Sequence, residues 1–136
     1  MRHWLVKFAP FRYSWQDCLA NGRFEIYSVR NYQARNNLQE MALGDRVLFY
    51  HSQKGRQIMG EMKVIEEAHQ DFTTSDERWV SVTFEPITNF DEPVTLTQLK
   101  EDGGFEELGL IRQPRLSVMP VEKCLYEKIL EMGNAN

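Results

Sequence analysis

The sequence predicts an α+β fold with a small mixed or antiparallel sheet. Short β-prone runs, such as residues 3–8 and 46–52, stand between segments of helical periodicity. The regular strand–helix alternation of a doubly wound fold is absent. A length of 136 residues, with 42% hydrophobic and 26% charged residues, is ordinary for a globular domain. We therefore expect a single domain over residues 1–136.

The first half of the chain carries local signals for the ends of its elements. Residues 3–8 are a short apolar strand. Ser14 and Asp17 have the spacing of a capping box, in which each side chain accepts a hydrogen bond from the other residue's backbone, and they predict a short helix ending near Gly22. Residues 31–41 form a second helix, because their apolar residues recur at helical spacing. A Gly-Asp turn then precedes the buried strand 46–52.

The second half predicts shorter elements and one clear helix. Residues 58–65 and 79–84 are expected strands on either side of the loop 70–77, because the second run alternates in polarity. A short helix is expected over 95–100 and a short strand over 115–118. A C-terminal helix ends at Gly133, and its predicted apolar stripe consists of Val121, Cys124, Leu125, Ile129 and Met132. The predicted core contains Leu38, Met41, Val47, Phe49, Val82, Phe84, Leu125 and Ile129.

Charge and composition restrict the possible function. The net charge of −4 disfavours a general DNA-coating protein, since such binding depends on many Lys and Arg. Residues 1–63 nevertheless hold ten Lys or Arg against five acids, whereas residues 64–136 hold six against fifteen, so one face is expected to be basic. No apolar run approaches the roughly 20 residues of a membrane span. We expect a cytoplasmic protein without membrane contact.

Signals for catalysis are weak. The segment 55–60 begins like a phosphate loop, but Glu61-Met62 follows where Lys-Ser/Thr is required. The three histidines are scattered, and Cys18 and Cys124 lack metal-ligand spacing. Cys18 is expected to be a buried thiol rather than a nucleophile. We therefore expect no catalytic residue, no metal and no cofactor.

One segment, residues 29–38, combines chemistry suited to recognition. It contains two Arg, three Asn, one Gln and one Tyr at the start of the second helix. Such side chains match base edges and phosphates, and a helix N-terminus offers free N–H groups. Asn31 and Arg35 share a helix face that differs from the apolar one. A solvated helix face, on which Asn31 is only the N-cap, is the other interpretation of this segment.

Several motifs together give the chain a family resemblance. The sequences VRNYQARNNL and VLFYHS, with WLVK near the start, YSW, and RQPRLSV before Pro120, resemble the EVE domain family. The resemblance extends over nearly the whole chain. It implies a PUA-like fold, with a small curved, barrel-like mixed sheet flanked by short helices and related to YTH domains. It further implies a non-catalytic module that reads a modified base in DNA or RNA.

The resemblance also implies a binding site. The residues that it places there are Lys7, Ser14, Trp15, Val29, Arg30, Asn31, Arg35, Tyr50, His51, Ser52 and Phe72. We expect the Arg30–Arg35 group to line one concave pocket together with Lys7, Ser14 and Trp15. For Trp15 and His51 a purely structural role in the core is the alternative. Phe72 is the one aromatic candidate for closing the pocket from the loop 70–78.

Two features of the sequence bear on the ligand. Lys7-Phe8-Ala9-Pro10 replaces the Lys-Ser-Glu-Pro that the family usually carries, which makes the rim less polar and less negative. The loop 70–78 is short for the family. We expect a monomer that binds DNA or RNA carrying a modified base. A regulatory domain that binds a small molecule or nucleotide in the same pocket is the alternative function.

Overall fold

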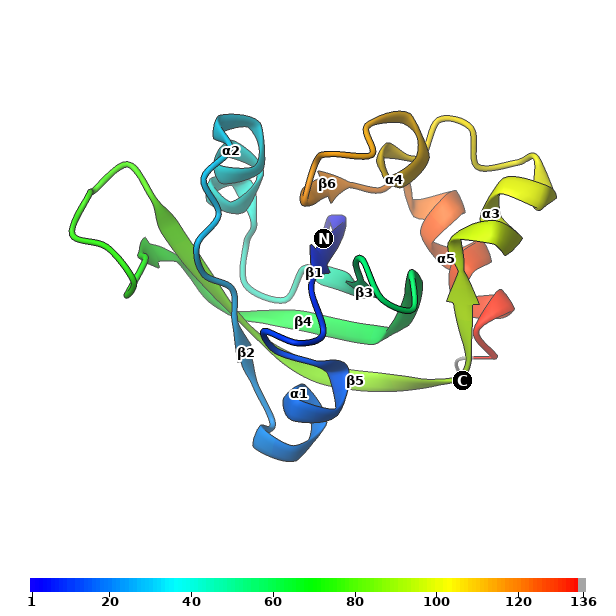
Figure 1. Cartoon of the computed structure of the whole chain (residues 1–136), viewed down its shortest axis with the longest axis horizontal. Coiled ribbons are helices and arrows are strands. Elements are labelled where there is room, and N and C mark those ends of the chain that lie inside the picture. The colour runs from blue at the N-terminus through cyan, green and yellow to red at the C-terminus, as the bar shows by residue number, and fades with distance from the viewer. Residues whose placement is uncertain (135–136) are drawn as a thin grey trace.

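A computed structural model describes residues 1–134 of the chain (Figure 1). It has six strands and five helices within that range, in a mixed α+β arrangement, as the sequence predicts. In chain order they are β1 (His3–Phe8), α1 (Trp15–Asn21), β2 (Phe24–Glu25), α2 (Tyr32–Glu40), β3 (Arg46–His51), β4 (Gln57–Gln70), β5 (Val80–Thr95), α3 (Leu96–Asp102), α4 (Gly109–Arg112), β6 (Val118–Pro120) and α5 (Lys123–Met132).

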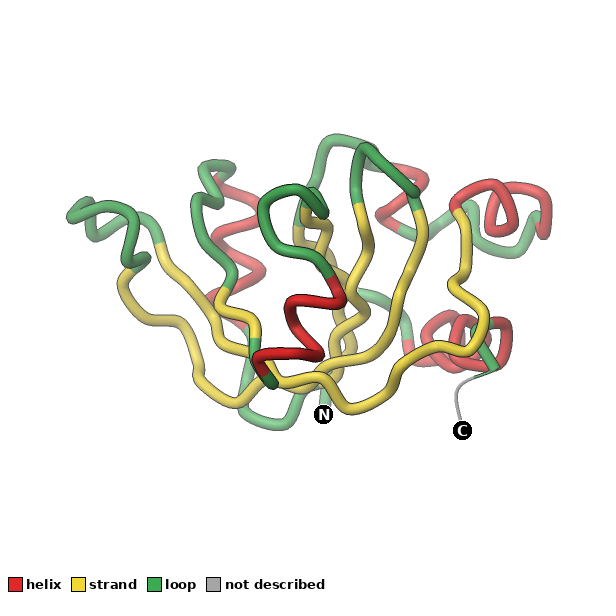
Figure 2. Tube along the Cα trace, turned by 60° about the horizontal axis from the view of Figure 1, so that its bottom comes forward, coloured by secondary structure: helices red, strands yellow, loops and turns green. Residues whose placement is uncertain are grey.

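The strands form one curved sheet in the order β2-β5-β4-β3-β1-β6. Only β1 and β3 are parallel, and every other pair is antiparallel, so the sheet is mixed. Figure 2 shows the strands bending round in one layer with the helices along its sides. The edge strands β2 and β6 do not pair with each other, and the barrel-like sheet therefore stays open. The predicted PUA-like architecture is confirmed.

Helix ends follow the local signals of the sequence. The Ser14 Oγ accepts a hydrogen bond from the Asp17 N–H at 3.0 Å, and the Asp17 carboxylate accepts one from the Ser14 N–H at 2.9 Å. Gly22 ends α1 in the left-handed conformation that glycine adopts without a steric penalty. The Asn31 Oδ1 accepts a hydrogen bond from the Ala34 N–H at 2.9 Å and caps α2. These bonds satisfy backbone N–H groups that a helix start leaves unpaired.

Trp15 lies at the centre of the core and joins four elements. Its backbone N–H donates to His51 Nε2 on β3 at 2.9 Å, and its indole N–H donates to Asn89 Oδ1 on β5 at 2.8 Å. Its ring lies against Gly60 of β4 so closely that a Cβ at this glycine would be 2.3 Å from the indole. Most of the predicted core is confirmed: Leu38, Met41, Val47, Phe49, Val82, Phe84 and Ile129 are buried, and Leu125 is partly buried.

The long hairpin of β4 and β5 extends well beyond the predicted strands. Its pairing register shifts at four places between Ile58 and His69. Each shift disrupts the polar–apolar alternation by which a strand is recognised in sequence, so the prediction ended both strands early. The short elements β2 and α4 lie where the sequence predicts no regular structure. The predicted strand 115–118 is wrong in position, because pairing with β1 places β6 at Val118–Pro120.

The predicted stripe of α5 is wrong at one position. Cys124 is exposed, and Tyr126 is buried in its place. The Tyr126 hydroxyl donates to Glu61 Oε2 at 2.8 Å, so its polar end has a partner inside the core. A buried tyrosine of this kind is not visible to a count of apolar residues. Cys18 is buried as predicted, and burial raises the pKa of its thiol to about 12.

Replacing Gly60 with Ala is expected to destabilise the protein. The new Cβ would overlap the Trp15 indole and the Thr88 carbonyl oxygen, 2.5 Å away, and such overpacking costs about 1–3 kcal/mol. Gly104→Ala is the matched control, because the atoms nearest to its Cβ are the ends of the Asp102 and Lys128 side chains. Urea unfolding measures both variants. Equal free energies of unfolding for the two would contradict the role assigned to Gly60.

Candidate nucleic-acid interface

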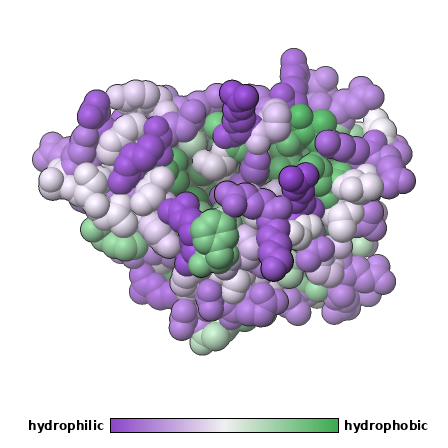
Figure 3. Space-filling model, in the orientation of Figure 1, coloured by the Kyte–Doolittle hydropathy of each residue, from purple (hydrophilic) through white to green (hydrophobic). Residues whose placement is uncertain are grey.

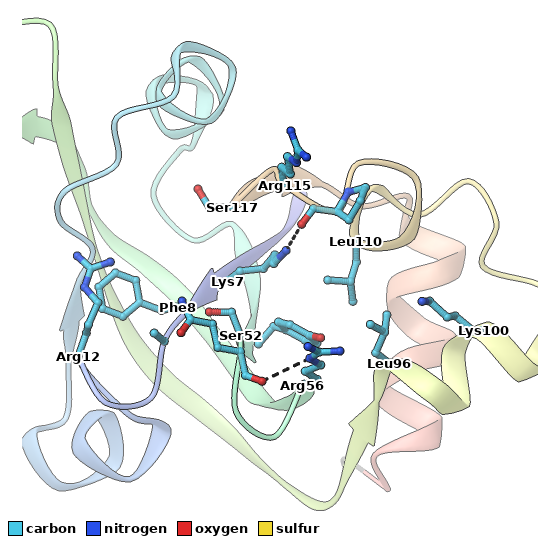
Figure 4. Close-up of a pocket in the computed structure, with 14 residues that line it drawn as sticks. Lys7, Phe8, Arg12, Ser52, Arg56, Leu96, Lys100, Leu110, Arg115 and Ser117 are labelled. Atoms are coloured by element: carbon cyan, nitrogen blue, oxygen red, sulfur yellow. Dashed lines mark hydrogen bonds between the residues drawn. The ribbon is translucent and has the colours of Figure 1, made fainter.

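A cavity of about 590 Å³ opens where the ends of β1 and β3 meet the segments around α3 and α4 (Figure 4). We call it the basic cavity. Its lining residues are Lys7, Phe8, Ala9, Arg12, Tyr50, Ser52, Gln53, Arg56, Leu96, Lys100, Leu110, Pro114, Arg115 and Ser117. In this protein of net charge −4, the lining contains five cationic residues and no Asp or Glu among the residues described.

Parallel pairing of β1 and β3 builds the floor of the basic cavity. Lys7 is paired with Tyr50 in this register, so both residues lie side by side near the carboxyl ends of their strands. The Lys7 N–H donates to the Ser117 carbonyl at 2.8 Å, which brings the 113–117 segment over the strand ends. The Lys7 ammonium donates to the Pro114 carbonyl at 2.6 Å. Burial lowers the pKa of Lys7 and raises the pKa of the Tyr50 phenol.

Arginines on two short turns form part of the rim. The Arg12 guanidinium lies 4.4 Å over the Phe8 ring and 4.9 Å over the Tyr27 ring. Arg56 follows the β3–β4 turn, and Figure 4 shows its bond to the Gln53 carbonyl. Both Gln53 and Arg56 have left-handed backbones, with φ of 63° and 47°. Non-glycine residues adopt this region rarely, and both of these residues line the cavity.

The cations of the basic cavity are free of carboxylates. Within the described residues, every ion pair of 4 Å or less lies elsewhere in the molecule, for example between Arg30 and Asp71 or between Lys128 and Asp102. Unneutralised cations with little competing negative charge produce a positive potential that attracts anions. The arrangement can therefore hold a phosphate or another anionic group.

Two further hollows extend the basic cavity into a groove. One shares Gln53, Arg56, Leu96 and Lys100 with it and adds Gly55, Thr95 and Thr97. The other shares Pro114 and Arg115 and adds Asn31, Gln33, Gln113 and Leu116. As described, neither lining contains an acid, and we call the three hollows together the basic groove. In Figure 3, which looks onto this face, hydrophilic side chains stand around hydrophobic surface near α4 and β6.

The predicted site residues fall into several groups rather than one pocket. Lys7, Tyr50 and Ser52 line the basic cavity, and Asn31 lines the adjoining hollow. The expected single pocket that joins Arg30, Asn31 and Arg35 to Lys7, Ser14 and Trp15 is therefore wrong. The error concerns where these residues lie in the fold. The predicted buried face of α2 is confirmed, because Ala34 and Leu38 are buried.

Ser14, Trp15 and His51 lie in structural roles. Ser14 caps α1, and Trp15 is fully buried. The buried His51 accepts the Trp15 backbone N–H on Nε2, which places its own ring proton on Nδ1. Burial lowers the pKa of His51. This ring is thus held neutral within the core.

The two arginines of the 29–38 segment contact the loop between β4 and β5 instead. Arg30 is ion-paired with the buried Asp71 at 3.0 Å and lies over the Trp79 ring. Arg35 donates to the Arg78 carbonyl at 3.0 Å and lies over the Tyr32 ring. The neighbouring Val29 is buried.

Phe72 also lies outside the basic cavity. Its ring is 62% exposed and packs against Tyr27 at 5.4 Å. It therefore does not close the cavity in this structure. The structure therefore does not place this candidate residue at the cavity.

Sequence reasoning missed most of the cationic rim. Arg12, Arg56, Lys100 and Arg115 come from four separate segments. The RQPRLSV motif contains Arg115, but it contributes only to the family resemblance and to the predicted strand 115–118, so it gives no signal for a cation at the site. Lys100 gave no signal, because one lysine on a short helix is ordinary surface. Among the described residues no group of three or more His, Cys, Asp or Glu is placed to hold a metal ion, and none of the helices is long and apolar enough to cross a bilayer.

A curved open sheet that carries an acid-free, cationic groove is characteristic of a domain that binds an anionic ligand. The EVE domain family matches residues 2–132, and the chain belongs to that family. It is similar to thymocyte nuclear protein 1 of Danio rerio, with 32% identity over 131 residues that cover 78% of this chain and 56% of the relative. The chain thus spans little more than half of that relative.

Solved structures resemble the chain along nearly its whole length. A protein of Agrobacterium tumefaciens matches with a TM-score of 0.95 and 37% identity, covering 98% of this chain and 93% of that one. The human THYN1 protein, in complex with DNA containing 5-methylcytosine, matches with a TM-score of 0.91 and 26% identity, covering 100% and 99%. That complex shows what the human relative binds.

The protein is expected to lose stability as the pH falls below about 6.5, the ordinary pKa of histidine, in part through His51. Its folded-state pKa is lowered by burial, so the unfolded chain takes up the proton first and unfolding is favoured in acid. His51→Gln keeps a hydrogen-bond acceptor for Trp15 without a titrating ring. Urea unfolding between pH 5 and pH 8 should show a weaker pH dependence on this acidic side for the variant.

His69 supplies a control of opposite sign. Burial lowers the pKa of His69, but hydrogen bonds to the Glu67 carbonyl and the Glu25 carboxylate outweigh it and raise the pKa. Its stabilising effect is therefore present at low pH and lost as the pH rises. His69→Gln should make the loss of stability in acid steeper. An unchanged pH dependence in His51→Gln would contradict the neutral, hydrogen-bonded state assigned to His51.

Proposed function

We propose that this chain binds DNA and reads a modified base, 5-methylcytosine, which enters the basic cavity while the groove holds the backbone phosphates. One observation carries the proposal: an acidic chain concentrates five unneutralised Lys and Arg around one acid-free cavity. The human relative with the same fold, crystallised with DNA containing 5-methylcytosine, supports this choice of ligand.

The size and lining of the basic cavity suit an extruded base. Its volume of about 590 Å³ is within the range of roughly 300–1,000 Å³ found for small-ligand sites. A base cannot be inspected fully within a duplex, so readers and base-modifying enzymes take it out of the stack. Apolar side chains such as Phe8, Leu96 and Leu110 line the cavity. They offer a surface on which a 5-methyl group gains contact that cytosine lacks.

Polar groups in the cavity match the edge of a pyrimidine. Cytosine presents an amino donor and carbonyl and ring-nitrogen acceptors. The cavity offers hydroxyls on Tyr50, Ser52 and Ser117, together with the Lys7 ammonium and the Pro114 carbonyl. Phosphates on either side of the base would meet Arg12, Arg56, Lys100 and Arg115. Charge-assisted bonds of this type are the stronger class of protein hydrogen bonds.

Recognition is proposed to occur without chemistry on the base. General acids, bases and nucleophiles in enzymes are most often His, Cys, Asp, Glu, Lys or Ser. Of these, the described lining includes Lys and Ser but no His, Cys, Asp or Glu, so no histidine or carboxylate of the lining stands beside its serines to activate them. Mass spectrometry of the oligonucleotide before and after incubation examines this point. Reproducible conversion of the base would overturn the proposed reader function.

The wild-type protein is expected to bind a duplex with one 5-methylcytosine about tenfold more tightly than its unmodified counterpart, because one methyl group packed against apolar side chains contributes about 1–3 kcal/mol. Fluorescence anisotropy at low salt measures both dissociation constants. The same titration with methylated single-stranded DNA and with RNA of the same sequence identifies the preferred polymer. Equal affinity for modified and unmodified DNA would contradict base reading, and preference for RNA would reassign the ligand.

Arg56→Ala and Lys100→Ala should weaken binding to modified DNA and to unmodified DNA equally. Each removes one phosphate contact, so the slope of log affinity against log salt should fall by about 1. Lys123→Ala is the matched control, since Lys123 is an exposed lysine on α5 and outside the basic groove. Affinity for a neutral metabolite without salt dependence, in place of DNA binding, would favour the small-molecule alternative.

A further inference from the structure

Phe11 stands out at the rim of the basic cavity as a large apolar side chain directed into solvent. It is 74% exposed, although Arg12, which follows it, and Ala9, two residues before it, both line the cavity. Exposing an aromatic ring forgoes the hydrophobic stabilisation that its burial would give. Single exposed hydrophobic residues are common, so the position and anchoring of Phe11 decide its meaning.

The turn that carries Phe11 is held firmly on both sides. The Arg12 and Tyr13 N–H groups both donate to the Ala9 carbonyl, at 3.0 and 3.3 Å, with Pro10 restricting the turn. On the far side, the Arg12 guanidinium lies over the Phe8 and Tyr27 rings. The Tyr13 hydroxyl donates to the Arg23 carbonyl at 2.6 Å, which ties the turn to the segment before β2. The ring of Phe11 is therefore presented by a fixed backbone.

A base that enters the basic cavity leaves a gap in the duplex beside this turn. Proteins that distort DNA insert apolar side chains such as Phe and Leu between base steps, which offsets the cost of unstacking. We infer that Phe11 is a wedge that enters the base stack at the place vacated by the modified base. This inference rests on the proposed function and adds the residue that makes extrusion from a duplex favourable.

A wedge should contribute to binding of a duplex but not of a single strand, whereas a contact in the cavity or with a phosphate should contribute to both. A single strand has no continuous stack, so nothing needs to be filled when its base enters the cavity. Phe11→Ala is therefore expected to weaken binding to a methylated duplex about tenfold, because the wedge no longer offsets part of the cost of unstacking a base step. Binding to the same methylated single strand should change less than about twofold. Phe11→Leu, which keeps an apolar wedge, should retain most of the duplex affinity.

Fluorescence anisotropy on the methylated duplex and the methylated single strand tests the wedge. Phe72→Ala is the matched control, because Phe72 is an exposed phenylalanine outside the lining of the basic cavity, and it should leave both affinities unchanged. Arg56→Ala should weaken both substrates alike. Urea unfolding of Phe11→Ala should match that of the wild type, as expected for an exposed side chain.

The outcomes separate this inference from the function on which it rests. Selective loss of duplex affinity in Phe11→Ala, restored in Phe11→Leu, supports the wedge. If the wild type prefers methylated DNA but Phe11→Ala weakens both substrates equally or neither, the wedge is overturned and the reader function stands. If the wild type shows no preference for methylated DNA, the reader function and the wedge both fall.

Discussion

The contact between Trp15 and Gly60 is the constraint on which the arrangement of this protein depends. The indole sits where a side chain on β4 would otherwise be, and its N–H donates to Asn89 on β5. The backbone N–H of the same residue donates to His51 on β3. One residue at the start of α1 thereby fixes the helix against the three central strands of the sheet. Ser14 caps the same helix, so the first turn of α1 is fixed both by the hydrogen bonds of its cap and by the packing of Trp15 in the core.

Fixing α1 also fixes the chain that leads into it. The turn 9–13 connects the end of β1 with Ser14, so its position follows from the parallel pairing of β1 with β3 and from the anchored helix. That turn contributes Ala9 and Arg12 to the basic cavity, and the adjacent strand ends contribute Lys7 and Tyr50. The packing of α1 in the core thus also determines the position of the turn that lines the basic cavity.

Positive charge in this protein is concentrated more clearly in one region of the structure than in one half of the sequence. The basic groove collects Lys7, Arg12 and Arg56 from the first half of the chain, and Lys100 and Arg115 from the acidic second half. Other cations of the first half, such as Arg2 and Arg30, are ion-paired elsewhere. A negative overall charge disfavours indiscriminate binding to nucleic acid, while a local positive groove attracts a phosphate backbone. The two properties together fit the proposed reading of a modified base in DNA.

Local signals in the sequence determined the helix ends, the first strands and most of the core. Caps such as those at Ser14 and Asn31 act within one helical turn, and the buried stripe of α2 needs only the helical period, so both can be predicted from neighbouring residues. The family motifs added the curved sheet and the general kind of ligand. The register shifts that lengthen β4 and β5 have no such local mark, because they arise from how two strands meet.

Tertiary structure alone decided which residues share the basic groove. Arg30 and Arg35 lie in the most suggestive segment of the sequence, yet the loop between β4 and β5 engages them through Asp71 and the Arg78 carbonyl. Arg56 and Lys100, from segments without any motif, reach the basic cavity instead. The physical reason is that a helix period sets which side a residue faces, whereas the distance to another element depends on how the whole chain packs.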